Sequence, residues 1–531
     1  MQAIKRCCIK ESQSHTADAP KTVSIIIGFF FFINCIVGVG FLGIPSVFRG
    51  AGLLTSVLTL VAISLFSWVT VTWLLEVMSR AQAIEDIKNQ PVGEQWAHFP
   101  NFRLETTRKF EQAELFEIFV HKGLKYFYGL VISISMLIAL WASCTVAGQA
   151  WSINFPLHFG PFNSCANDSL FDNRYAPEDG GCLASYRFCV FLYAMIVIPL
   201  SLLDLREQSI IQTALGVVRF TLVGSMVLYC LVKMVQDACA PDSSFYSNCT
   251  KIDTDSLATF DFKKFLAAIP VFLYAQAVHP SVATLSHPIR QKKQLRWLVL
   301  IVLLTTTMLY TILGTMISLW FGDGTLGMAT LNWFPFTKPG HSVQLRMLSY
   351  LIVLFPSLDV CTTYPLLVYT LVNNIYLIFM GRDTSQASHA YEWWIRLGMK
   401  AVIAVLPIMC AMFVANLLYV LTYGGLVTFF NFFFFPAVLQ LASQWKCIKV
   451  FGNQQALLCN EGAKDETADD ENAPLMGVKS AQQRACGVQA VYTTPYSIPG
   501  LSHPIAVLLV SVVGLVLFTL AFVGAVYRSI S

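Results

Sequence analysis

Residues 34–52 read NCIVGVGFLGIPSVFRGAG and lie inside the first long apolar stretch of the chain. Gly38 and Gly40 fall at its centre, where glycine costs about 1 kcal/mol relative to alanine in a helix interior. Backbone groups freed from helical hydrogen bonds cannot face lipid, so a break here is tolerated only against protein or a cavity. We therefore expect a discontinuous membrane helix whose free amides, those of Gly38, Val39 and Gly40, form an anion site sized for a carboxylate. A close contact between helices through small residues is the alternative that this motif alone leaves open.

The composition places the chain in a membrane. Of its 531 residues, 56% are hydrophobic and 12% are charged, and the mean hydropathy is +0.61. A soluble protein of this length is far less apolar. The net charge of +4 comes without a basic run, so no nucleic-acid partner is expected.

Apolar runs long enough to cross a hydrocarbon core of about 30 Å recur along the chain. No alternation typical of membrane strands competes with them, so an all-α polytopic membrane protein is expected. The eleven expected spans are residues 23–48, 53–78, 125–153, 187–203, 209–234, 264–286, 297–320, 346–379, 398–420, 424–444 and 502–527.

Lysine and arginine orient these spans. Basic residues gather before the first span, between the second and third, in RQKKQLR (290–296) and after the tenth, whereas the opposite loops hold fewer. The positive-inside rule then places the N-terminus in the cytosol and the C-terminus on the other side.

Cysteines and glycosylation sequons agree with that orientation. Cys165, Cys182 and the sequon at Asn167 follow the third span, and a second sequon at Asn248 follows the fifth. Disulfides and N-glycans both require the non-cytosolic side. We expect a Cys165–Cys182 disulfide, with pairing between the two loops left open.

The spans divide into two groups of five. Because five is odd, the second group enters the membrane from the opposite side, as in inverted-repeat transporters. The expected segments are a cytosolic tail (1–22), a first repeat (23–236), an outer loop (237–263), a second repeat (264–445), a disordered cytosolic loop (446–500) and an eleventh helix with its tail (501–531).

The long loop contains an acidic dileucine-like pattern at Glu471, Leu475 and Met476. A signal read by a sorting adaptor and an ordinary acidic linker are equally compatible with this pattern. An adaptor requires the cytosolic side, which the expected topology provides.

The sixth span, AAIPVFLYAQAVHPSVATLSHPI (267–289), is also broken. Pro280 lacks an amide donor and clashes with the preceding turn. The carbonyls released there would face the amides of the first break, so a zwitterion fits between them. Its ammonium group would lie against Gln276, Ala277 and Val278.

Two charged residues lie deep in other spans. Arg219 is ten residues into the fifth span, or about 15 Å deep, where an unpaired charge costs several kcal/mol. Asp359 is the only acidic residue near the centre of any expected span, so we expect the two to be neighbours. A role in coupling and a simple lock between two helices both remain open.

Aromatic and histidine side chains near the breaks have competing interpretations. Tyr274 is a candidate gate over the substrate. His279 is more typical of a hydrogen-bonded structural residue than of a proton carrier. The cluster FFNFFFFP (429–436) is expected to face lipid and pack against helices rather than stack on a substrate.

The order of a broken N-x-x-x-G-x-G span, a proline-broken sixth span and a 5+5+1 plan resembles the amino acid/auxin permease superfamily. Within it, the pieces NCIVGVGFLGIP, VHPSVATLSHPI and LFPSLDVCTTYP are similar to the transmembrane protein 104 branch. The resemblance implies an inverted-repeat fold and secondary transport of amino acids by alternating access, with the substrate between the two broken helices.

The resemblance also bears on coupling. Sodium-coupled relatives build a cation site from an asparagine like Asn34 and hydroxyls like those of Thr362 and Thr363. Arg219 departs from that pattern because its guanidinium occupies or repels such a site. We expect proton-coupled or uncoupled transport, with Asp359 or His279 as the protonatable group. An amino acid sensor with little flux is the alternative.

An enzyme is not expected. The chain shows no paired catalytic acids, no nucleophile and base, and no metal-ligand spacing within its spans, so neither a cofactor nor a metal is expected. The expected location is the endosomal, lysosomal or plasma membrane.

Overall fold

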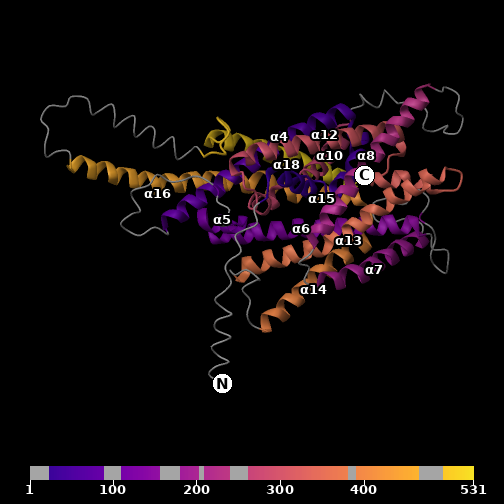
Figure 1. Cartoon of the computed structure of the whole chain (residues 1–531), viewed down its shortest axis with the longest axis horizontal. Helices are drawn as coiled ribbons and strands as arrows, with labels where there is room; N and C mark the ends of the chain where they lie inside the picture. The colour runs from indigo at the N-terminus through magenta and orange to yellow at the C-terminus, as the bar shows by residue number, and fades with distance from the viewer. Residues whose placement is uncertain are drawn as a thin grey trace, which may run out of the picture.

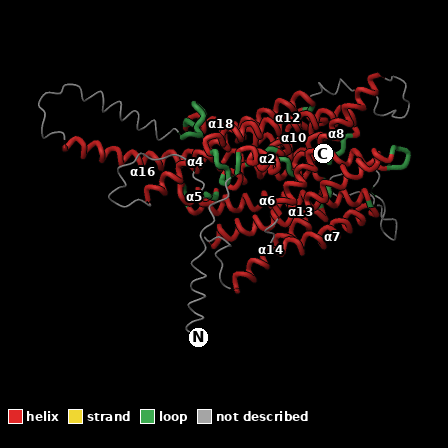
Figure 2. The backbone as a smooth tube through the Cα atoms, in the orientation of Figure 1, coloured by secondary structure: helices red, strands yellow, loops and turns green. Residues whose placement is uncertain are grey.

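The computed structural model describes residues 23–88, 104, 109–155, 165, 180–202, 208–239, 261–380, 390–465 and 494–530. Within these residues the chain is helical, with two isolated β-bridges and no strand (Figure 2). Ten of the described helices are long and apolar enough to span a membrane, and the bent pair α2 and α3 supplies an eleventh. The expected all-α polytopic membrane protein is confirmed.

The helices follow the expected order. The first five spans are α2 (Ile25–Ile36) with η1 (Val39–Gly43) and α3 (Ile44–Ala51), then α4 (Leu53–Lys88), α6 (Lys122–Asn154), α7 (Gly180–Leu202) and α8 (Gln208–Cys239). The remaining spans are α10 (Phe262–Ala275) with η3 (His279–Ser281) and α11 (Val282–Ser286), α12 (Leu295–Phe321), α13 (Val343–Met380), α14 (Ala390–Phe413), α15 (Leu417–Phe429) with η8 (Phe430–Phe434) and α16 (Phe435–Asp465), and α18 (Pro504–Ile530). Short helices α5 (Gln112–Phe119), η4 (Lys292–Gln294), η5 (Gly322–Gly324) and η6 (Ala329–Thr337) lie between spans.

Several boundaries differ from the sequence prediction, three of them at the ends of spans. The ninth span ends at Phe413, because Asn416 caps the next helix through its side-chain oxygen. Helix α4 runs ten residues past its expected end at 78, and α16 continues to Asp465. Polar residues in a helix end the hydropathy signal before the helix itself ends.

Eight spans pack as two groups of four (Figure 1). The first helix group contains spans one, two, six and seven, which are α2 with α3, α4, α10 and α12. The second helix group contains spans three, four, eight and nine, which are α6, α7, α13 and α14. Each group therefore takes two consecutive spans from each half of the chain. Helix α8 contacts both groups, and so does α15.

Burial separates the central helices from the peripheral ones. In the sixth span, Phe262–Ser286, 67% of the most apolar stretch is buried inside the protein, against 17% in the eleventh span. The broken sixth span thus lies at the centre, and the eleventh span exposes most of its apolar surface at the periphery.

Several sequence predictions fall outside the described residues. They are the tail 1–22, the two sequons at Asn167 and Asn248, and the sorting pattern at Glu471, Leu475 and Met476.

Candidate functional site

The first span is broken at its glycines. Helix α2 ends at Ile36, and the chain bends by 51° before η1 and α3 continue. The Gly38 amide turns back to Ile36 O at 2.8 Å, and no heavy atom lies within 4 Å of the position that a Cβ on Gly38 would take. The amides of Val39 and Gly40 precede the first hydrogen bond of η1 and stay available to a ligand.

The sixth span is broken one turn before Pro280. Helix α10 ends at Ala275, and Gln276, Ala277 and Val278 lie outside regular structure until η3 begins. The Val278 carbonyl accepts from Ser281 N at 3.0 Å. Among the described residues, no donor reaches the carbonyls of Gln276 or Ala277, which leaves these two acceptors facing the break.

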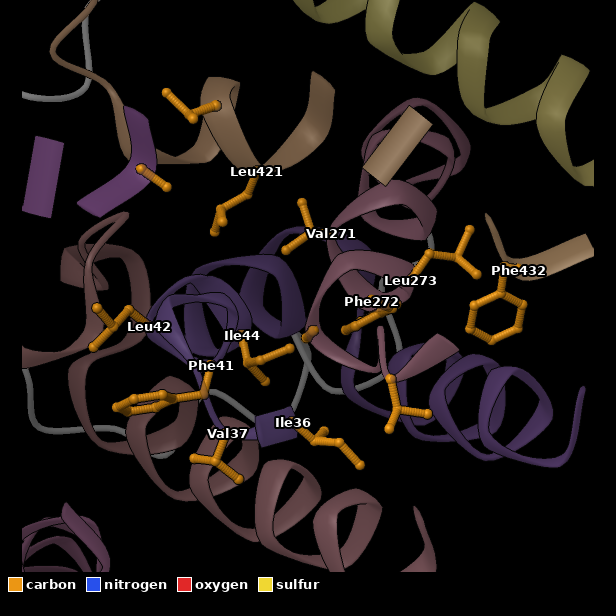
Figure 3. Close-up of a cluster of buried hydrophobic side chains, with 14 of the residues drawn as sticks. Ile36, Val37, Phe41, Leu42, Ile44, Val271, Phe272, Leu273, Leu421 and Phe432 are labelled. Carbon is orange, nitrogen blue, oxygen red and sulfur yellow. The ribbon is translucent and has the colours of Figure 1, made fainter. Parts of the chain in front are cut away.

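Close packing brings the two breaks together. A Cβ on Gly40 would lie 2.9 Å from Ala275 Cα, so only glycine permits this approach. The Tyr310 hydroxyl on α12 lies 3.2 Å from both Ile36 O and Ala275 O, the last carbonyls of α2 and α10. Figure 3 shows the apolar side chains of Ile36, Val37 and Phe41 close to one another at the first break. Tyr310 was not predicted as a site residue, and its only signal is a polar group in the middle of an apolar span.

The side chains of Gln276 and Tyr274 contact different helices at the break in the sixth span. The buried Gln276 amide donates to Thr307 and accepts from Thr306, both at 3.2 Å, so its side chain is held by α12. The half-buried Tyr274 ring lies against the glycine positions Gly40 and Gly424, between the first and tenth spans.

Arg219 and Asp359 form a buried ion pair. Arg219 Nη2 donates to both carboxylate oxygens of Asp359, at 2.7 and 2.6 Å. Arg219 Nη1 donates to the carbonyls of Val37 and Asn34 (3.3 Å for Asn34) at the end of α2. One guanidinium from α8 therefore connects the first break to the centre of α13.

The other residues of the implied cation site surround this pair. Thr362 and Thr363 hydroxyls donate to Asp359 O on their own helix, at 2.9 and 3.2 Å. The side-chain oxygen of Asn34 is buried without a partner in the described part of the chain. A Cβ on Gly216 would lie 3.0 Å from that oxygen, so glycine lets α8 approach α2 here.

His279 belongs to a second network of polar side chains, besides that of Arg219 and Asp359. Its Nε2 lies 2.8 Å from the Thr70 hydroxyl of α4, and Gln112 Nε2 donates to its carbonyl. Tyr128 donates to Gln112 Oε1 at 2.9 Å. His279 Nδ1 is buried and finds no partner among the described atoms. Sequence reasoning selected His279 but missed Gln112, which lies on α5 outside the spans.

The phenylalanine cluster has a π-helical segment, η8. Phe429, Phe432, Phe433 and Phe435 are buried, whereas 43% of Phe434 is exposed. The centre of the Phe432 ring lies 4.4 Å from the centre of the His279 ring. The cluster is therefore mostly a packing surface, and it touches the sixth-span break through Phe432.

A third polar cluster was missed because it lies at the end of an expected span. Glu76 and Arg80 on α4 are fully buried and pair at 2.7 Å. Gln440 contacts both of them, donating to Glu76 and accepting from Arg80. No group of three or more His, Cys, Asp or Glu residues suited to a metal is found where the structure gives positions.

Cys165 and Cys182 form a disulfide, with their Cα atoms 5.0 Å apart. The pairing is the one expected within the loop after the third span. It ties that loop to the start of α7.

Comparison with known proteins identifies the family. Residues 21–456 match the model of the family described as transmembrane amino acid transporter protein. The human transmembrane protein 104 is 23% identical over 433 residues, covering 73% of this chain and 81% of its own. The Caenorhabditis elegans transmembrane protein 104 homolog is 24% identical over 372 residues, covering 69% and 71%. The family model spans both broken helices and the Arg219–Asp359 pair, and the chain belongs to the transmembrane amino acid transporter family.

Proposed function

We propose that this protein moves an amino acid across the membrane by alternating access and does so without sodium. The substrate would lie between the two breaks, with its carboxylate on the amides of Val39 and Gly40. Its ammonium group would face the carbonyls of Gln276 and Ala277. Free donors and free acceptors at adjacent helix breaks are what a zwitterion requires.

The contacts of Arg219 support the proposal that transport does not require sodium. The guanidinium joins carbonyls of the first helix group, at Asn34 and Val37, to the Asp359 carboxylate of the second helix group. A bound cation in sodium-coupled transporters makes the same kind of connection between carbonyls and side-chain oxygens. In this proposal the Arg219 guanidinium would act as a tethered cation in that position.

Coupling to protons would use His279 or Asp359. Asp359 is engaged on both oxygens by Arg219. His279 Nδ1 finds no partner among the described residues, so this nitrogen would be the one to exchange a proton. His279 is therefore the better candidate if transport is coupled, and uncoupled transport is the alternative.

The location and partners belong to the same proposal. The N-terminus would be cytosolic, in an endosomal, lysosomal or plasma membrane. A sorting adaptor would bind the pattern at Glu471, Leu475 and Met476 on the cytosolic side.

The test is uptake of a panel of labelled amino acids into proteoliposomes under sodium, proton or no gradient. We expect saturable uptake that is indifferent to sodium and is lost in Arg219→Met. The control variant Asp323→Asn breaks the pair with Arg49 at a side chain that is 94% exposed, and it should retain uptake. Strict sodium dependence without any response to pH would contradict the proposed coupling. Binding without flux under every gradient would assign the protein as an amino acid sensor.

A further inference from the structure

An apolar groove of about 350 Å³ lies between the tenth and eleventh spans. Its walls come from η8 and α16 on one side, including Phe430, Ala437 and Leu441, and from α18 on the other, including Ser511 and Phe518. The walls are almost entirely apolar. The groove is separate from the two helix breaks and from the Arg219–Asp359 pair.

Fixed aromatic rings shape this groove. Phe518 packs edge to face against Phe429 and Phe430, with ring centres 5.5 and 5.7 Å apart. The Phe433 ring lies against Gly514, where a Cβ would be 2.7 Å from the ring. Because these contacts hold the rings in place, the hollow is a built feature of the interface between η8 and α18. An occupant gains dispersion contacts that flat helix surfaces do not offer.

The length of the groove matches one leaflet of a bilayer. Residues 429 and 441 mark its ends along the tenth span, and twelve residues of helix rise about 18 Å. Half of a hydrocarbon core is about 15 Å thick. Leu508 and Leu515 on its rim are 55% and 66% exposed, so the groove opens toward lipid. An acyl chain has the length and the chemistry that this surface requires.

A cation and a tryptophan lie beyond one end of the groove. Trp445 is 67% exposed, and it follows Leu441 by about one helical turn. Lys449 follows by another turn, and its ammonium lies 5.6 Å from the centre of the Trp445 ring. Exposed tryptophan is typical of the membrane interface, and lysine near it attracts anionic headgroups. The neighbouring Lys446 is engaged differently, because it donates to Ile118 O on α5.

We propose that this groove binds an anionic phospholipid, with an acyl chain between η8 and α18 and the phosphate at Lys449. The charged end of α16 lies on the side that the positive-inside rule assigns to the cytosol. The cytosolic leaflet is the one that carries anionic lipids. The bound lipid joins the peripheral eleventh span to the span that touches His279 through Phe432.

The test is lipid retention by the purified full-length protein. The protein is first delipidated and then titrated with phosphatidylserine or phosphatidylcholine. Native mass spectrometry measures how much of each lipid stays bound. Ser511→Trp fills the groove. Val516→Trp is the matched control, because Val516 on the same helix is 53% exposed and does not line the groove. Lys449→Gln removes the headgroup cation.

We expect the unchanged protein and Val516→Trp to retain phosphatidylserine, and Ser511→Trp to lose it. Lys449→Gln should keep binding phospholipid while its preference for phosphatidylserine falls about fivefold, the factor for one lysine at a membrane surface. Equal retention by the two tryptophan variants would overturn the acyl-chain site. An unchanged lipid preference in Lys449→Gln would overturn the headgroup assignment.

Discussion

Arg219 connects three spans, its own and two others. It comes from α8, donates to the end of α2 and pairs with Asp359 on α13. Its side chain is 5% exposed and that of Asp359 is 12% exposed, so neither charge is solvated by bulk water. The pair therefore has to stay matched, because a buried charge without its partner is far more costly than the pair is favourable.

Replacing Asp359 by asparagine should destabilise the protein strongly. The change leaves the Arg219 charge buried and uncompensated, at a cost of about 3–5 kcal/mol. The measurement is the midpoint of thermal unfolding of the purified protein in detergent. We expect Arg219→Met combined with Asp359→Leu to recover most of the loss, because no unpaired charge remains.

The control for that measurement is Asp323→Asn. Asp323 pairs with Arg49, but its side chain is 94% exposed, and exposed pairs contribute little. If the unfolding midpoint of Asp359→Asn is no lower than that of Asp323→Asn, the Arg219–Asp359 pair does not stabilise the protein.

At the scale of elements, the two broken helices depend on close contacts between backbones. The tenth span comes into backbone contact with α10 at Gly425, where an added Cβ would overlap Pro270 O. Tyr310 then ties α2 and α10 by their last carbonyls. The breaks are thus held by neighbouring helices in addition to their own few hydrogen bonds.

Alanine at Gly425 should separate α15 from α10. Overpacking a filled interior costs about 1–3 kcal/mol of stability. Here the added methyl group would press on the Pro270 backbone, which cannot rotate away as a side chain can. We expect a lower unfolding midpoint and less monodisperse protein in size-exclusion chromatography. Gly224→Ala on α8 is the control, since no atom lies within 4 Å of the added Cβ. Similar behaviour of the two variants would contradict the close approach.

At the scale of the whole molecule, the two helix groups meet around one site. Span one belongs to the first group and Asp359 to the second, and α8 supplies the cation between them. A change in the relative position of the groups must therefore stretch or break the Arg219 contacts. This is the physical basis on which alternating access would open the site to one side and then to the other.

The orientation of the whole chain is testable through its glycans. With a cytosolic N-terminus, the loops containing Asn167 and Asn248 face away from the cytosol. Glycosidase treatment of protein from mammalian cells should increase its electrophoretic mobility. The double variant Asn167→Gln with Asn248→Gln should migrate at the treated position without treatment. An N-terminal tag accessible only from the non-cytosolic side would contradict this orientation.

Much of the fold could be predicted because its signals are local. Apolar run length predicted eleven spans, and glycine or proline within a run predicted the breaks in spans one and six. The boundaries were less accurate where polar residues are buried. Glu76 and Arg80 ended the hydropathy signal of the second span, although their mutual pairing lets α4 continue to Lys88.

Short stretches of the chain are enough to predict a helical membrane protein with two interrupted spans, since hydropathy and backbone preferences reside in them. A partner for Arg219 is also predictable, because a deep charge cannot remain alone. Three contacts follow from tertiary packing instead: the same guanidinium binds the α2 carbonyls, Tyr310 joins the two breaks, and Gln112 binds the His279 carbonyl. Those contacts depend on the rotation and depth of helices distant in the sequence, which their own residues do not specify.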